Sequence, residues 1–110
     1  MAKKIMMQIE KMLLKLFAER AIIINKIVVI GSYSKSLNKL GSDIDIIVIS
    51  SNFRNRDIFE RVEATSGIHR ELVRKLNKPI DIMYYSDVEW ERGRSLIINE
   101  AKQSGEIIYG

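Results

Sequence analysis

The chain has 110 residues and no cysteine, and its 18 basic and 14 acidic residues give a formal net charge of +4. Without cysteine, a disulfide framework, a thiolate zinc site and thiol catalysis are excluded, and the composition fits a reducing compartment such as the cytoplasm. A hydrophobic content of 46% predicts one domain, 1–110, with its own core. So small an excess of positive charge favours a mixed, solvated surface over a nucleic-acid-binding one.

The amino-terminal segment predicts a helix over 4–19. Its apolar residues recur at helical spacing and form one face: Ile5, Ile9, Met12, Leu13, Leu16 and Phe17. This face either closes the domain's own core or contacts a second chain, whereas Met1 and Met6 are expected to fray. The segment turns polar too early for a signal peptide, and no apolar run approaches the length of a membrane span.

Two short apolar runs, 27–30 and 46–49, are β-branched and almost free of polar residues, which predicts strands buried on both faces. Asp43 and Asp45 stand where the second strand begins. Because residues two apart in a strand point to the same side, these carboxylates project side by side, with Ile44 turned to the other face. Like charges held this close repel, and a bound divalent cation would remove that penalty.

The segment between these strands begins with Gly31 and Ser32 and is predicted as a short helix or turn over 32–40. A strand that ends in Gly-Ser and opens a helix presents backbone N–H groups to an anion such as a phosphate. An ordinary glycine turn is the alternative. The chain contains neither a G-x-G-x-x-G sequence nor a P-loop, so neither of those nucleotide-binding motifs applies.

The second half of the chain predicts further helices and strands. The expected elements are a polar loop over 50–56, a helical region over 57–76 that Gly67 can divide, a strand over 78–85, a helix over 87–103 that opens with a capping box of Ser86 and Glu89, and a strand over 106–109. Apolar patches on the first helical region comprise Ile58, Phe59 and Val62, then Ile68, Leu72, Val73 and Leu76; Trp90, Leu96, Ile97, Ile98 and Ala101 are expected to pack inward. His69, the single histidine, is expected to be an exposed helical residue. This succession of helices and strands predicts an α/β fold with one central sheet.

Asp81 is the single acidic residue of the strand predicted over 78–85. If that strand lies beside the one that follows Asp45, the carboxylates of Asp43, Asp45 and Asp81 converge. Three carboxylates on adjacent strands suit a two-metal centre for phosphoryl or nucleotidyl transfer, with Mg²⁺ as the ion that such oxygen ligands hold. A calcium site or a solvated strand edge is the alternative.

This pattern resembles the minimal nucleotidyltransferases, the smallest members of the DNA polymerase β-like superfamily. Gly31-Ser32 is followed after ten residues by Asp43-Ile44-Asp45, and a later strand carries Asp81. The resemblance implies a mixed β-sheet flanked by helices and the transfer of a nucleoside monophosphate, most simply AMP from ATP, with release of pyrophosphate.

The resemblance also implies roles for the site residues. The three aspartates would be catalytic and would hold one or two Mg²⁺ ions, and Gly31 and Ser32 would hold the triphosphate. Many relatives carry Arg-Gly where this chain has Lys35-Ser36. Lys35 keeps the positive charge for a phosphate contact but lacks the planar fork of arginine.

The acceptor of the nucleotide is open. The resemblance implies a hydroxyl on a helical HEPN-type partner, a toxin ribonuclease that its antitoxin adenylylates, and a homo-oligomer is a further expectation. A small-molecule acceptor is the next alternative, and a nucleic acid is not expected as the main substrate. The competing hypothesis is a non-catalytic subunit that binds a nucleotide or a partner.

Overall fold

The computed structural model of the chain describes residues 2–30 and 44–110. Within these ranges the elements, in chain order, are α1 (Ala2–Ala18), β1 (Lys26–Ile30), β2 (Ile44–Ile49), the short 3₁₀ helix η2 (Ser51–Phe53), α2 (Ile58–Ala64), α3 (Ile68–Leu76), β3 (Ile80–Tyr85), α4 (Asp87–Arg92), α5 (Leu96–Ser104) and β4 (Glu106–Tyr109). The expected strands are thus confirmed. No helix in the described ranges is both long enough and apolar enough to cross a membrane.

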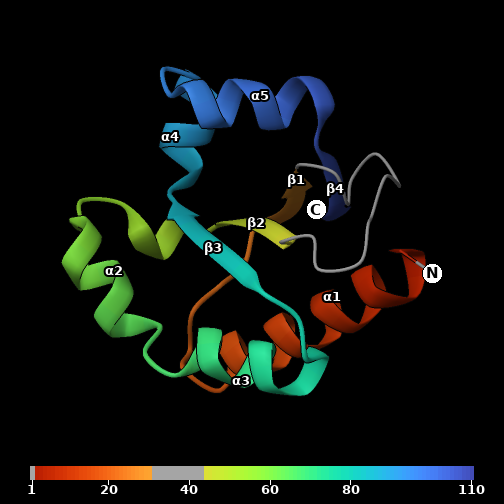
Figure 1. Cartoon of the computed structure of the whole chain (residues 1–110). Helices are drawn as coiled ribbons and strands as arrows, with labels where there is room; N and C mark the ends of the chain where they lie inside the picture. Colours follow the sequence, from red (N-terminus) through yellow and green to blue (C-terminus); the bar gives the residue numbers. More distant parts are fainter. Residues whose placement is uncertain (1, 31–43) are drawn as a thin grey trace.

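The described strands form one mixed sheet in the order β3-β2-β1-β4. β1 runs antiparallel to both β2 and β4, whereas β2 and β3 run parallel. Helices cover both faces of this sheet: α4 and α5 lie on one side, and α1 and α3 lie on the other (Figure 1). The predicted α/β fold with a single mixed central sheet is confirmed.

The two inner strands carry the core on both of their faces. Along β2, alternate residues face opposite helical layers, so that Ile46 packs towards α1 and α3 while Ile47 packs towards α4 and α5. Both side chains are fully buried, as the continuous apolar runs predict. Together these layers fix β2 in the middle of the domain.

Helix α1 closes the domain's own core. Ile9, Leu13 and Phe17 are fully buried against the sheet and α3, so this face is not available to a second chain. Met6 is also buried, and the expectation that it frays is wrong. The reason is that Met6 lies one turn before Ile9, on the same apolar face.

Glycines divide two of the predicted helices. Gly67 separates α2 from α3 with a φ of 88°, as expected. The single helix predicted over 87–103 is instead two helices, because Gly93 ends α4 in the left-handed conformation and Ser95 caps the start of α5. Leu96 therefore begins a new helix and is exposed, contrary to the expectation that it packs inward.

Candidate nucleotide-transfer site

Two of the three predicted aspartates lie side by side at the amino end of the parallel strand pair. Asp45 on β2 and Asp81 on β3 are register partners. Neighbouring strands lie about 4.8 Å apart, and in-register side chains of a sheet point to the same face. Asp45 therefore shares its face with Ile47, and Asp81 shares it with Met83, towards the α4 and α5 layer.

Exposure changes along this face from the core to the acidic pair. Ile47 is fully buried, Asp45 is half-buried and Asp81 is exposed. The carboxylates therefore lie where the packed sheet opens to solvent, at the edge of the apolar cluster between the sheet and helices α4 and α5. Two like charges at such a position are electrostatically unfavourable unless a cation or another partner compensates for them.

The remaining predicted site residues lie outside the described ranges. Gly31, Ser32, Lys35 and Asp43 all belong to the segment 31–43. The described residue before it, Ile30, is the antiparallel register partner of Asp45. The described residues on either side of it, Ile30 and Ile44, therefore lie at the same end of the sheet as the acidic pair.

The described residues fit part of a magnesium site. Carboxylate oxygens are the ligands that Mg²⁺ prefers in proteins, and Asp45 and Asp81 supply them from adjacent strands. In the ranges 2–30 and 44–110 no group of three or more acidic, histidine or cysteine side chains could hold a metal ion. The third predicted carboxylate, that of Asp43, lies outside those ranges.

His69 is exposed on α3, as predicted. Its Nε2 atom makes a hydrogen bond with the backbone carbonyl of Ile80. The side chain of Ile80 packs in the core beneath α1 and α3, so α3 approaches the sheet from the face opposite to the two aspartates. This histidine anchors α3 to β3.

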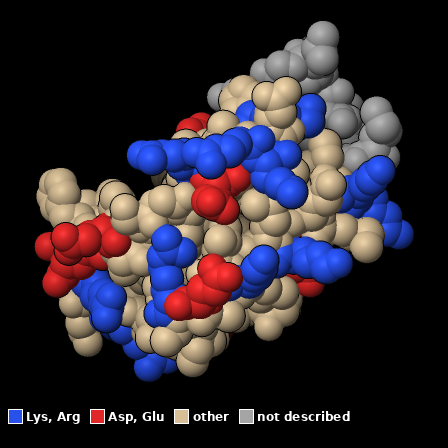
Figure 2. All heavy atoms as spheres, turned by 90° about the horizontal axis from the view of Figure 1, so that it is seen from below, with Lys and Arg blue, Asp and Glu red and all other residues tan. Residues whose placement is uncertain are grey.

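The surface over α1 and α3 carries charges of both signs. Lys and Arg side chains are interspersed with Asp and Glu across this face (Figure 2). A nucleic-acid-binding face usually presents a continuous basic stripe. This arrangement fits the mixed, solvated surface that the charge balance predicts.

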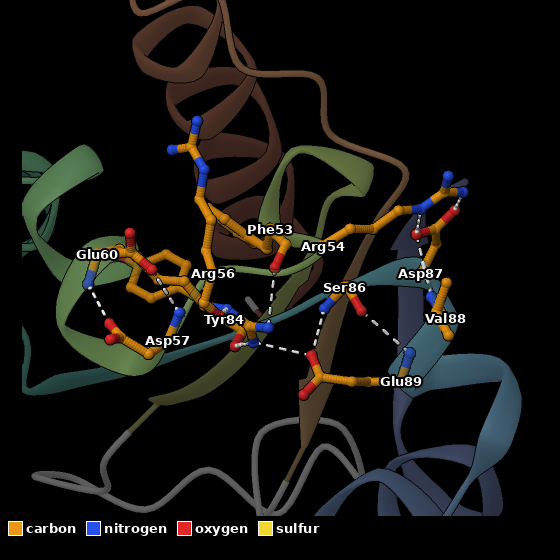
Figure 3. A network of polar contacts seen from close by, with 11 residues as sticks. Phe53, Arg54, Arg56, Asp57, Glu60, Tyr84, Ser86, Asp87, Val88 and Glu89 are labelled. Atoms are coloured by element: carbon orange, nitrogen blue, oxygen red, sulfur yellow. Dashed lines mark hydrogen bonds and ion pairs between the residues drawn. The ribbon is translucent and has the colours of Figure 1, made fainter.

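A second polar network, not identified from the sequence, lies at the carboxyl end of β2 and β3. At its centre is Arg61 of α2, which is 9% exposed. Its Nη1 atom donates to the Tyr84 carbonyl at 2.9 Å and to Oε1 of Glu89 at 2.8 Å, and Nη2 donates to the Phe53 carbonyl at 2.9 Å (Figure 3). The Nε atom donates to the carbonyl of Arg56 at 3.0 Å. The network joins η2, α2, β3 and α4.

Glu89 connects this network to the start of α4. Its carboxylate accepts from the backbone N–H of Ser86, and the Ser86 hydroxyl accepts from the N–H of Glu89, which is the predicted capping box. Burial raises the pKa of Glu89, but the hydrogen bonds from Ser86 and Arg61 outweigh that effect and hold it below its usual value. The only sequence signal for this centre was the capping box, since the carbonyls that bind Arg61 leave no side-chain pattern.

Comparisons with solved structures agree with the fold. A chain of a toxin–antitoxin complex crystallised with AMP-PNP superposes with a TM-score of 0.64 at 24% identity, covering 92% of this chain and 73% of that one. A chain from the complex of a tri-AMPylated Shewanella oneidensis HEPN toxin with its MNT antitoxin gives a TM-score of 0.60 at 22% identity, covering 100% and 73%. At these identities the likeness concerns the fold.

The family follows from the sequence itself. No curated protein sequence matches the chain. The model of the nucleotidyltransferase domain family matches residues 6–108, a range that includes β1, β2, β3, most of β4 and both aspartates of the acidic pair. This chain belongs to the nucleotidyltransferase domain family.

Proposed function

We propose that this protein is a magnesium-dependent nucleotidyltransferase that transfers AMP from ATP to a hydroxyl group of a HEPN-type toxin, and so acts as an antitoxin. The observation that carries the proposal is the in-register placement of Asp45 and Asp81 on parallel strands at the solvent end of the sheet. The family supplies the reaction class, nucleotidyl transfer.

The acidic pair would hold the metal with Asp43. When bound there, Mg²⁺ would neutralise the carboxylates and the charge that develops on the triphosphate. Asp45 and Asp81 would position it, and one of the site's carboxylates would accept the proton of the attacking hydroxyl. Gly31 and Ser32 would hold the triphosphate through backbone N–H and hydroxyl groups, and Lys35 would add a positive charge near it.

The proposed reaction balances without a redox partner. The acceptor oxygen forms a bond to the α-phosphorus of ATP, and the bond from that phosphorus to the bridging oxygen of the β-phosphate breaks. Pyrophosphate leaves with the electron pair, and the hydroxyl proton passes to a carboxylate and then to solvent. The choice of ATP and of a HEPN-type acceptor is supported by the AMP-PNP and the AMPylated toxin that occur in the complexes of the structural neighbours.

The test is a transfer assay with ATP labelled at the α-phosphate, Mg²⁺ and the product of the neighbouring gene. We expect the label on that protein, a mass increase of one AMP, and pyrophosphate release. Asp81→Asn should lower the rate of all three by about a hundredfold or more. Label on a small alcohol or on an RNA end would change the acceptor and keep the reaction class, whereas no pyrophosphate with any acceptor would favour a non-catalytic binding subunit.

A further inference from the structure

Helix α2 is attached to the domain through a polar residue and turns its apolar residues outward. Ile58 is 69% exposed, Phe59 81% and Val62 56%, while the buried residue of this helix is Arg61. The apolar patch predicted here thus exists but does not pack inward, because the buried hydrogen bonds of Arg61 orient the helix. Large apolar side chains gathered on one helical face in this way mark an interaction surface.

The exposed apolar stripe formed by Ile58, Phe59 and Val62 borders a groove along β3, which is the edge strand of the described sheet. A cavity of about 370 Å³ lies between Ile58 and Val62 of α2 and Ile82 and Tyr84 of β3. Two outward-facing carbonyls of this edge already accept hydrogen bonds, that of Tyr84 from Arg61 and that of Ile80 from His69. An added β-strand would have to displace both side chains, so the geometry favours a helix as the occupant.

Opposite charges lie at the two ends of the stripe. Arg56 precedes α2 and borders one end of the groove, whereas Glu63 in the last turn borders its continuation beside Val62. Among the described residues, the ion pairs are those of Arg54 with Asp87 and of Arg61 with Glu89, so neither Arg56 nor Glu63 is engaged in one. In Figure 3 the Arg56 guanidinium extends away from the network, and none of the hydrogen bonds or ion pairs drawn there involves it.

This charge order is self-complementary. We propose that α2 pairs antiparallel with α2 of a second copy of this chain, about a two-fold axis that passes near Phe59. Phe59 is three residues after Arg56 and four before Glu63, so reversing the partner helix about this point places each Arg56 beside the other copy's Glu63. A two-fold interface uses the same patch on both subunits, and here one patch supplies both charges and the apolar centre.

The dimer is expected to be weak. One short helix and the adjoining groove give an interface at the low end of specific complexes, so we expect a dissociation constant on the order of micromolar. The two Phe59 rings supply an aromatic contact at the axis. The acidic pair lies at the amino end of β2 and β3, away from α2, so each copy keeps its own site open.

Sedimentation velocity of the full chain across a concentration series tests the proposal. We expect a reversible monomer–dimer equilibrium in the parent. Phe59→Glu places like charges at the axis and should weaken the dimer by about a hundredfold or more. The matched control is Leu96→Glu, because Leu96 is equally exposed but lies on α5, and this variant should dimerise like the parent.

A charge exchange separates pairing from a general loss of folding. Arg56→Glu and Glu63→Arg should each weaken the dimer by about tenfold, and the double variant should restore it. Each single change puts a favourable charge at its end of the α2 dipole, so weaker pairing could not be attributed to melting of the helix. The proposal is overturned if the parent stays monomeric at high micromolar concentration, or if Phe59→Glu dimerises like the parent. Pyrophosphate release by Phe59→Glu should match that of the parent, so the dimer and the proposed reaction can fail independently.

Discussion

The two ends of the parallel pair β2–β3 use charge in opposite ways. At the amino end, Asp45 and Asp81 bring two negative charges together where the sheet opens to solvent. At the carboxyl end, the buried Arg61 meets the partly exposed Glu89 and three backbone carbonyls. Opposite charges with satisfied hydrogen bonds hold elements in place, whereas like charges side by side weaken the fold unless a cation or another partner compensates for them. The carboxyl end thus has the chemistry of a structural joint, and the amino end carries the like-charged pair on which the proposed metal site rests.

The largest expected effect is the loss of AMP transfer in Asp81→Asn. Removing one carboxylate from the proposed metal site should lower the rate of transfer by between about a hundredfold and a thousandfold. Because the change also removes a like charge from the position next to Asp45, the free energy of unfolding without Mg²⁺ should stay constant or rise by about 0.5 kcal/mol. Transfer assays and urea unfolding measure the two quantities.

The control for this variant is Glu106→Gln. Glu106 is an exposed acidic residue of β4, two strands away from Asp45 in the sheet, and its change should alter neither transfer nor stability. A clear loss of stability in Asp81→Asn would contradict the proposed difference between the two ends of the strand pair, because Asp81 would then be a structural residue.

Arg61→Met should have the reverse profile. When the Arg61 guanidinium is removed, Glu89 loses its cationic partner. The carbonyls of Phe53 and Tyr84 each lose a hydrogen-bond donor. Breaking such a network should lower the free energy of unfolding by about 3 kcal/mol. The folded fraction should still transfer AMP, because the acidic pair lies at the other end of the strands.

Arg70→Met is the matched control, since Arg70 is an exposed arginine on α3. The double variant Arg61→Met with Glu89→Gln should recover part of the loss, because no charge is then left without its partner. Urea unfolding of the four proteins gives the comparison. If Arg61→Met were as stable as the parent, the carboxyl end could not be regarded as a joint.

Gly105 lies where the end of α5 meets β1, and Gly105→Ala tests whether this packing affects the amino end of the parallel pair. A Cβ atom at Gly105 would lie 2.6 Å from the carbonyl oxygen of Ala101, 2.9 Å from Val28 and 3.0 Å from Ile30. These contacts are too close, so we expect the free energy of unfolding to fall by about 2 kcal/mol. Ile30 pairs with Asp45, so transfer should also fall severalfold in the folded protein. Gly93→Ala, at the end of α4, should lower stability by about 1 kcal/mol and leave transfer unchanged.

The amino end could be predicted from the sequence because its signals are local. The apolar runs indicate β1 and β2. The alternation of strand residues predicts that Asp45 and Ile44 point to opposite faces of the sheet, as the structure confirms. From the residues alone, Asp81 meets Asp45 only if their strands are neighbours, and the family resemblance implied a mixed sheet without saying which strands run parallel. The structure supplies the parallel pairing of β2 and β3. The catalytic, metal-binding and phosphate-binding roles of the predicted site residues all stay predictions: Gly31, Ser32, Lys35, Asp43, Asp45 and Asp81.

The carboxyl end could not be predicted in the same way. Helical periodicity correctly groups Ile58, Phe59 and Val62 on one face but does not say whether that face points inward. The orientation of α2 depends on carbonyls of η2 and β3 that accept from Arg61, and these are backbone groups that any sequence possesses. Phe53, in a loop predicted to be polar, is fully buried, with its ring against Tyr84 and beneath the Arg61 guanidinium.

The smallest expected effect concerns the pH dependence of the carboxyl end. The pKa of Glu89 is raised by burial but lowered by more through its hydrogen bonds with Ser86 and Arg61, so it lies below its usual value. A carboxyl group with a lower pKa in the folded chain stabilises the fold above its unfolded-state pKa. That contribution is lost as the pH falls through the folded-state pKa. Because 42% of the Glu89 side chain is exposed, solvent screening keeps the contribution below about 1 kcal/mol.

Urea unfolding of the parent and of Glu89→Gln, from about pH 7 down to pH 3, measures this contribution. At neutral pH the variant should be slightly less stable than the parent, and in acid the two curves should converge, because the protonated glutamate and the glutamine are then equally uncharged. Glu71→Gln, an exposed acidic residue of α3, should give a curve parallel to that of the parent. If the free energies of unfolding of the parent and of Glu89→Gln differed by the same amount at every pH, the Glu89 charge would not stabilise the network. Only the hydrogen bonds of Arg61 to the carbonyls would then distinguish the carboxyl end from the amino end.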